Sequence, residues 1–142
     1  MTAQLPDGVY EEVRALCKQG DEEAKTGSRQ AARQNYMAAL QLLPGDPRVW
    51  DAATWIYVSI GETYFGEKDF ENAFKCYFNA VQSAGGLGNT LVHLRLGQLY
   101  YEGGKLEKAG DELARAYMGA GADIFIREDP KYFEFLKTKI II

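Results

Sequence analysis

The stretch IGETYFGEKDFENAFKCYF, residues 60–78, decides how this chain folds. Its apolar and aromatic residues recur at helical spacing on either side of a polar break, and Gly61 lies inside the first helical run. A glycine in a helix interior costs about 1 kcal/mol relative to alanine. We therefore expect two helices joined by a turn, in close contact at Gly61.

The same pattern occurs three times along the chain. It consists of an aromatic-x2-apolar-Gly-x2-Tyr half, followed by an Ala-x3-apolar-x2-Ala half. Copies with both halves occupy residues 57–80 and 93–116, displaced by 36 residues. An earlier copy at residues 16–39 has a weaker first half and is followed by Pro44. Three copies in register indicate a repeat architecture, in which stacked units build the core together.

This pattern resembles the tetratricopeptide repeat, a helix-turn-helix unit with the consensus W-x2-L-G-x2-Y…A-x3-F…P. Matched to that consensus, the repeats span approximately residues 13–46, 54–87 and 90–123. Tyr57 and His93 replace the consensus tryptophan, and only the first copy keeps the closing proline. The resemblance implies an all-α fold, a right-handed α-solenoid of about three helix-turn-helix units.

One domain over residues 1–142 is expected, with a capping helix at approximately residues 130–140. The pair Asp46-Pro47 predicts the start of a helix of about 20 residues, because aspartate caps helices and proline suits their first position. Asp129-Pro130 predicts the start of the capping helix in the same way. The segment before Val13 is expected to be partly disordered. Replacing Gly61 by leucine is expected to cost roughly 1–3 kcal/mol or more through overpacking.

Charge and composition argue against a nucleic-acid or membrane partner. A formal net charge of −4 and a pI near 5.1 argue against a nucleic-acid partner. No apolar run approaches the roughly 18 residues of a membrane span, and no signal peptide is recognisable, so a cytoplasmic protein without a membrane partner is expected. Cys17 and Cys76 are interpreted as reduced packing residues.

No site for chemistry is apparent in the sequence. His93 is the only histidine, and it occupies an aromatic packing position of its repeat. The glycine clusters lack the Lys-Ser/Thr that a phosphate-binding loop needs. The sequence therefore predicts a protein that is not an enzyme, with no catalytic residue, no metal site and no cofactor.

The resemblance to the tetratricopeptide family implies a concave groove lined by the first helix of each unit, which binds a peptide or helix of a partner protein. In the first unit the corresponding positions hold Arg14, Cys17, Asp21, Ala24 and Lys25. The predicted partner-binding residues are Trp55, Val58, Glu62, Phe65, Leu91, Leu94, Arg95, Gln98 and Tyr101. An alternative is that the C-terminal helix or a second chain covers some of them.

The predicted lining is apolar and aromatic, which favours a hydrophobic or amphipathic segment as the ligand. Family members that grip the C-terminal carboxylate of heat-shock chaperones resemble one another in a basic clamp. The five clamp positions hold Cys17, Asp21, Ser59, Leu91 and Arg95 here, and only the arginine matches. A carboxylate clamp is therefore not expected.

The favoured function is a small adaptor-like or chaperone-like binding module, with an immunity protein or a secretion chaperone as its specialised forms. A self-associating homodimer is the alternative, with Trp50, Trp55 or the tail KTKIII at its interface. An enzyme accessory or catalytic domain is a third and weaker hypothesis. If Phe65 and Tyr101 face an open groove, changing each to lysine is expected to abolish partner capture with little loss of stability.

Overall fold

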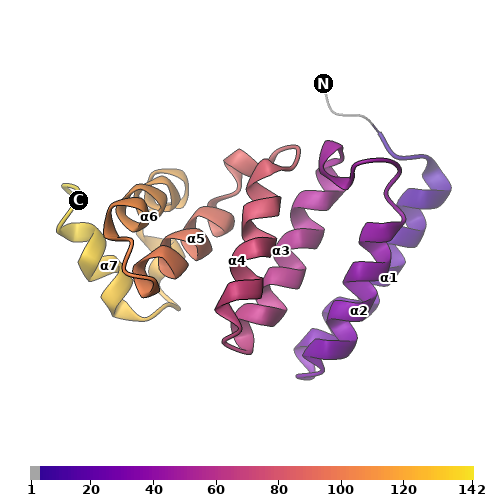
Figure 1. The fold of residues 1–142 in the computed structure, drawn as a ribbon, viewed down its shortest axis with the longest axis horizontal. Helices are drawn as coiled ribbons and strands as arrows, with labels where there is room; N and C mark the ends of the chain where they lie inside the picture. Colours follow the sequence, from indigo (N-terminus) through magenta and orange to yellow (C-terminus); the bar gives the residue numbers. More distant parts are fainter. Residues whose placement is uncertain (1–3) are drawn as a thin grey trace. The chain divides into compact units, whose positions relative to one another are not determined.

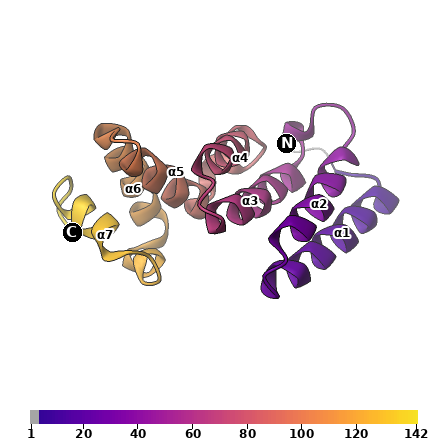
Figure 2. The same ribbon diagram turned by 60° about the horizontal axis from the view of Figure 1, so that its bottom comes forward.

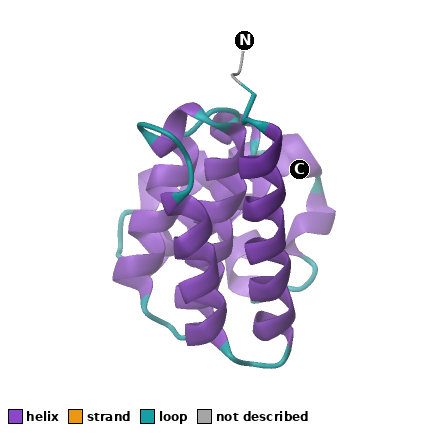
Figure 3. Cartoon of the chain, turned by 90° about the vertical axis from the view of Figure 1, so that its right-hand side faces the viewer, coloured by secondary structure: helices purple, strands orange, loops and turns teal. Residues whose placement is uncertain are grey.

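The computed structural model describes residues 4–142, and every regular element in that range is helical (Figure 3). The all-α expectation is confirmed. The α-helices, labelled in Figure 1, are α1 (Asp7–Lys25), α2 (Arg29–Gln41), α3 (Asp51–Gly66), α4 (Phe70–Gln82), α5 (Thr90–Glu102), α6 (Leu106–Ala120) and α7 (Pro130–Lys137). Three 3-10 turns, η1 (Pro47–Val49), η2 (Gly86–Gly88) and η3 (Ala122–Phe125), lie between them.

The chain forms two compact units, the first ending at Leu87 and the second spanning Gly88–Ile142. In the first unit α1 pairs with α2 and α3 with α4, while α2 also packs on α3 (Figure 2). In the second unit α5 pairs with α6, and α7 packs on α6. Each predicted repeat thus corresponds to one helical hairpin. The prediction of a single domain over residues 1–142 stays a prediction.

The repeated glycine marks the closest approach inside each hairpin. A Cβ atom at Gly61 would lie 2.8 Å from Cε1 of Tyr77, a separation that real Cβ atoms do not tolerate. The equivalent distance from Gly20 to Cε1 of Tyr36 is 2.7 Å. A bulky side chain two turns into the second helix therefore fills the space that each glycine leaves empty.

The third hairpin is tighter still. A Cβ atom at Gly97 would lie 2.6 Å from Cγ of Leu113 and 3.0 Å from its backbone nitrogen. The close contact predicted at Gly61 and Gly97 is therefore confirmed, and the first hairpin has the same contact at Gly20.

One local expectation was wrong, and a second is tested only in part. The helix expected to run on from Pro47 is interrupted: η1 ends at Val49, Trp50 is extended with φ −102° and ψ 138°, and α3 begins at Asp51. The Trp50 indole donates a hydrogen bond to the Pro44 carbonyl at 2.8 Å, which holds the chain in this bend. The segment before Val13 is helical from Asp7, while residues 1–3 lie outside the described residues.

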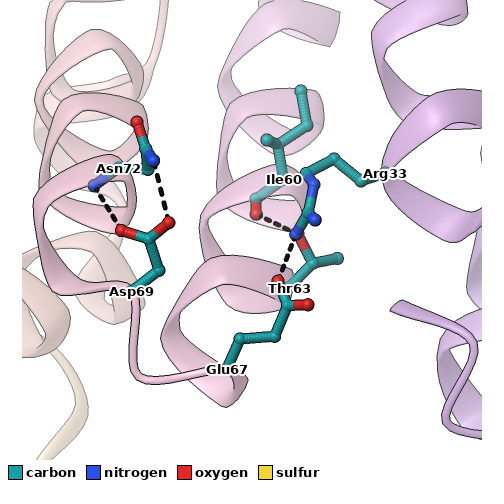
Figure 4. Close-up of polar contacts among 6 residues, drawn as sticks. All are labelled: Arg33, Ile60, Thr63, Glu67, Asp69 and Asn72. Carbon is teal, nitrogen blue, oxygen red and sulfur yellow. Dashed lines mark hydrogen bonds and ion pairs between the residues drawn. The ribbon is translucent and has the colours of Figure 1, made fainter. Parts of the chain in front are cut away.

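Polar contacts fix α2 against the C-terminal end of α3 in the first unit (Figure 4). The Arg33 guanidinium on α2 donates to the Thr63 hydroxyl at 3.1 Å and pairs with the Glu67 carboxylate at 2.5 Å. Asp69 caps α4 by accepting from the backbone and side-chain nitrogens of Asn72. The Arg33 contacts therefore hold α3 against α2 of the preceding hairpin, and the Asp69 cap fixes the start of α4.

Candidate functional site

Three adjoining cavities lie along α1 and α3 in the first unit. Their volumes are about 420, 620 and 340 Å³. Tyr10 and Trp55 line both of the first two cavities, and Asp21 lines both the second and the third, so the three form a continuous depression. We call this depression the α1–α3 groove.

Aromatic rings dominate the end of the groove where α1 and α3 begin. Tyr10 is 45% exposed and Trp55 37% exposed, and Trp50 lines the same cavity. The hydrogen bond to Pro44 fixes the Trp50 ring. The Arg14 guanidinium lies 5.7 Å from the Tyr10 ring centroid, within the range of a cation–π contact. This end of the groove therefore presents large, partly fixed rings to solvent.

Carboxylates accompany these rings. Asp7 and Asp51 line the aromatic cavity, and no cationic residue among residues 4–142 lines it. Within residues 4–142 neither carboxylate takes part in a hydrogen bond or an ion pair. Further along, the groove is mixed in charge, with the acidic residues Glu11, Asp21 and Glu62 and the basic residues Arg14, Lys18 and Arg29. The aromatic end is thus the only purely acidic part of the groove.

Buried tyrosines orient the acids at the centre of the groove. The Tyr36 hydroxyl donates to the Asp21 carboxylate at 2.6 Å, and the Tyr77 hydroxyl donates to Glu62. Burial, and then the hydrogen bond to Asp21, raise the pKa of Tyr36, so its hydroxyl stays protonated and remains a donor. Burial also raises the pKa of the Cys17 thiol to about 12. Cys17 is therefore a poor nucleophile.

Several predicted partner-binding residues line the groove. Trp55 lines the first and second cavities, and Val58 and Glu62 line the third. Phe65 lines none of the three, because its ring packs against Phe70 of α4 with 5.5 Å between centroids.

The predicted residues of the second unit are covered by the chain's own C-terminal segment, η3 to α7. Leu94 and Gln98 are fully buried, and Leu91 packs partly buried against the same core. The Arg95 guanidinium pairs with the Glu128 carboxylate at 2.6 Å. Gln98 donates to the same carboxylate at 2.8 Å.

Tyr101 is covered by α7 itself. Its ring packs edge-on against Tyr132 and Phe135, with centroid distances of 5.5 and 5.1 Å. The Glu102 carboxylate beside it accepts from the Tyr132 hydroxyl and the Lys131 ammonium, each at 2.7 Å. In this structure the second unit therefore has no open counterpart of the α1–α3 groove at these positions, as the alternative interpretation of the sequence expected.

Two residue differences between the hairpins accompany this difference in covering. The first two hairpins pair the repeated glycine with a tyrosine whose hydroxyl binds the acid after the glycine, as Tyr36 does with Asp21. The third has Leu113 instead, which has no hydroxyl, and Gln98 instead of an acid. Gln98 is thereby available to donate to Glu128 of the C-terminal segment.

The groove residues that sequence reasoning missed include Asp7, Tyr10, Trp50 and Asp51 at the aromatic end. Asp7 and Tyr10 precede the first predicted repeat, and Trp50 and Asp51 lie between two repeats. The consensus covers neither region. The signal available for α1 was the apolar series Leu5, Val9, Val13 and Leu16, which has helical spacing and extends the helix toward the N-terminus.

Other kinds of site find no support in the described part of the chain. Residues 4–142 contain no cluster of three or more metal-ligating side chains. The His93 imidazole is buried and lies 2.6 Å from the Glu112 carboxylate. No described helix combines the length and the apolar character needed to cross a membrane.

Comparison with known proteins agrees with this geometry. Residues 56–84 match the family model of the tetratricopeptide repeat. The structure is similar to the first tetratricopeptide domain of Spaghetti (RPAP3) bound to the HSP90 peptide SRMEEVD, with 20% identity, a TM-score of 0.68, and coverage of 90% of this chain and 92% of that chain. It is likewise similar to the first such domain of human RPAP3, with 22% identity, a TM-score of 0.69, and coverage of 90% and 94%.

A search of curated proteins finds no match. The repeated glycine contacts, the all-helical hairpins and these likenesses agree with one another: residues 56–84 match the tetratricopeptide repeat, and the chain has the fold of tetratricopeptide domains.

Proposed function

We propose that this protein is a cytoplasmic protein-interaction module that binds a hydrophobic or amphipathic segment of a partner in the α1–α3 groove. The observation that carries the proposal is the aromatic end of the groove, where Tyr10 and Trp55 remain substantially exposed although each lines a cavity. Exposed aromatic side chains beside a depression are the usual anchors of a protein interface. Val58 and Glu62 extend the surface along α3.

The proposal places binding in the first unit. Leu91, Leu94, Arg95, Gln98 and Tyr101 of the second unit become available to a partner only if the C-terminal segment leaves them. Their contacts with Glu128 and with the α7 rings give them an intramolecular role instead. No catalytic step is part of the proposed function.

Similar domains support a peptide as the ligand class, since one of them is bound to an HSP90 peptide. An acidic C-terminal peptide is not the ligand proposed here, because the positions of the basic clamp hold Cys17 and Asp21 in the first unit. Masking of a toxin or of a secreted effector, as an immunity protein or a secretion chaperone does, is the specialised form of the proposal.

Affinity capture from native lysate tests the proposal. The wild type is compared with a Tyr10→Ser/Trp55→Ser double variant and with a Phe78→Ser control, which removes an exposed ring from α4 outside the groove. A partner lost only by the double variant supports the groove. A partner retained by both variants, after both are shown to be folded, contradicts it.

A self-associating scaffold is the second candidate. It is favoured by exposed apolar side chains in the second unit, among which Met118 is 81% and Ile126 73% exposed. Sedimentation equilibrium of the wild type and of a Met118→Glu/Ile126→Glu variant tests it: a dimer that becomes a monomer in the variant supports the scaffold.

A further inference from the structure

We propose that the segment bound in the α1–α3 groove is basic, and that one of its lysine or arginine side chains enters the aromatic cavity between Asp7 and Asp51. This inference rests on the proposed function and adds the chemistry of the ligand to it. The tetratricopeptide fold by itself does not imply this polarity, which follows from the residues of this chain.

Charge complementarity is the first argument. Five acidic and three basic side chains line the groove, and the two acids at its aromatic end have no partner within residues 4–142. A carboxylate beside an apolar surface favours a cationic ligand, because a cation compensates the water that the carboxylate loses when the cavity is filled. An acidic ligand would face like charges there.

The rings supply the second argument. A cation held over the face of a tryptophan or tyrosine within about 6 Å of the ring centroid is attracted by the ring quadrupole. Tyr10, Trp50 and Trp55 all line the cavity that holds Asp7 and Asp51, and the Trp50 ring is already fixed by its bond to Pro44. The Arg14 guanidinium over Tyr10 shows that a ring of this groove accepts a cation.

The third argument is the volume of the aromatic cavity and the sequence of charged residues along the groove. The aromatic cavity, of about 420 Å³, lies within the usual range of roughly 300–1,000 Å³ for ligand pockets. The neighbouring cavity is lined by Arg14 and Lys18 together with Glu11 and Asp21, so its side-chain charges balance and it does not favour a second cation. We therefore expect one cationic side chain at the aromatic end, followed by apolar residues along α3 toward Val58.

The two tryptophans of the chain provide a direct measurement, because both line the aromatic cavity. Tryptophan emission of the full chain is titrated with the acetylated, amidated peptide LKLFKL and with versions carrying glutamate or norleucine in place of both lysines. We expect a shift of the emission maximum, and affinity for the lysine peptide at least tenfold higher than for the glutamate peptide. The difference should shrink on raising NaCl from 50 to 500 mM.

Two double variants with the same change in net charge test whether Asp7 and Asp51 cause the preference for the lysine peptide. Asp7→Asn/Asp51→Asn is expected to lower the affinity for the lysine peptide at least fivefold and to leave that for the norleucine peptide within twofold. The control Glu107→Gln/Asp111→Asn changes the net charge equally with exposed acids of α6, and should bind like the wild type. The peptide series on the wild type tests the inference even if the aspartate variant fails to fold.

The outcomes separate the two proposals. Equal affinity for the lysine, norleucine and glutamate peptides, or tighter binding of the acidic peptide SRMEEVD, overturns the basic ligand but leaves binding in the groove standing. An unchanged emission spectrum with every peptide up to 1 mM overturns the basic ligand as well. If lysate capture is also unaffected by Tyr10→Ser/Trp55→Ser, the groove itself is not the binding site.

Discussion

The first helix of a hairpin has different surroundings in the two units of this protein. In the first unit, α1 and α3 leave a groove in which Tyr10 and Trp55 are exposed. In the second, the corresponding face of α5 is covered by the segment from η3 to α7. A residue at a groove position of the repeat is therefore not necessarily available to a partner. The element that packs on that position decides whether the side chain faces solvent or the core.

Leu136→Ala should produce the largest effect, since this fully buried leucine of α7 belongs to the core of the second unit. We expect a loss of about 3 kcal/mol of unfolding free energy, measured in urea, because deleting it leaves a cavity. Ile141→Ala is the control, because that side chain is entirely exposed. A loss below about 1 kcal/mol for Leu136→Ala would contradict a packed cover over α5.

Gly97→Ala should lower the free energy of unfolding by about 2 kcal/mol, and Gly61→Ala should lower it by less. The new methyl group meets Leu113 Cγ and approaches its backbone in the second unit, whereas at Gly61 it meets only ring atoms of Tyr77. Gly8→Ala is the matched control: nothing lies within 4 Å of its Cβ, so better helix propensity should stabilise it by up to about 1 kcal/mol. Thermal unfolding of the three variants measures the order, and equal effects would argue against hairpins of different tightness.

Tyr101→Ala and Trp55→Ala compare the stability contributions of a covered ring on α5 and a partly exposed ring on α3, the first helices of their hairpins. Tyr101 packs on two rings of α7, so we expect a loss of about 2 kcal/mol. Trp55 is partly exposed, so its loss should stay below about 1 kcal/mol. The sequence-based expectation of little stability loss applied to a Tyr101 that faces an open groove, and the structure packs this ring against α7 instead. Urea unfolding distinguishes the two, and the reverse order would mean that α7 does not hold Tyr101.

Glu128→Gln should destabilise the second unit by about 1–2 kcal/mol. The Arg95 and Glu128 side chains are only 12% and 17% exposed, and removing the charge of Glu128 weakens the pairing of a largely buried guanidinium. Glu134→Gln is the control, because Glu134 makes an exposed pair with Lys137. Equal stability of the two variants by urea unfolding would show that Glu128 does not contribute to holding the C-terminal segment.

The smallest effect concerns pH. The hydrogen bond from Lys131, and then that from Tyr132, hold the pKa of Glu102 below its usual value of 4.5. The carboxylate therefore stabilises the fold above pH 4.5, and this contribution is lost as the pH falls through its lowered pKa. We expect the stability difference between wild type and Glu102→Gln to shrink between pH 6 and pH 3.5, measured by urea unfolding. A constant difference would exclude this linkage.

Much of the fold could be predicted because its signals are local. The glycine at 61, the tyrosine at 77 and the cap at Asp129 each act through neighbours within one hairpin or turn. The break at Trp50 could not be predicted, since its bend depends on a hydrogen bond to Pro44 that only the folded chain makes. For the site, Trp55, Val58 and Glu62 were predicted from the repeat pattern and line the groove.

The sequence by itself determined the repeat, the helical hairpins and the points of closest contact, because helix periodicity and the absence of a glycine side chain are properties of the residues themselves. Only the tertiary structure decided which face stays open. Burial of Leu94 and Gln98 depends on a segment about 30 residues further along the chain, at Glu128. The aromatic groove likewise depends on tertiary packing, because Tyr10 on α1 and Trp55 on α3 belong to two successive hairpins and line the same cavities.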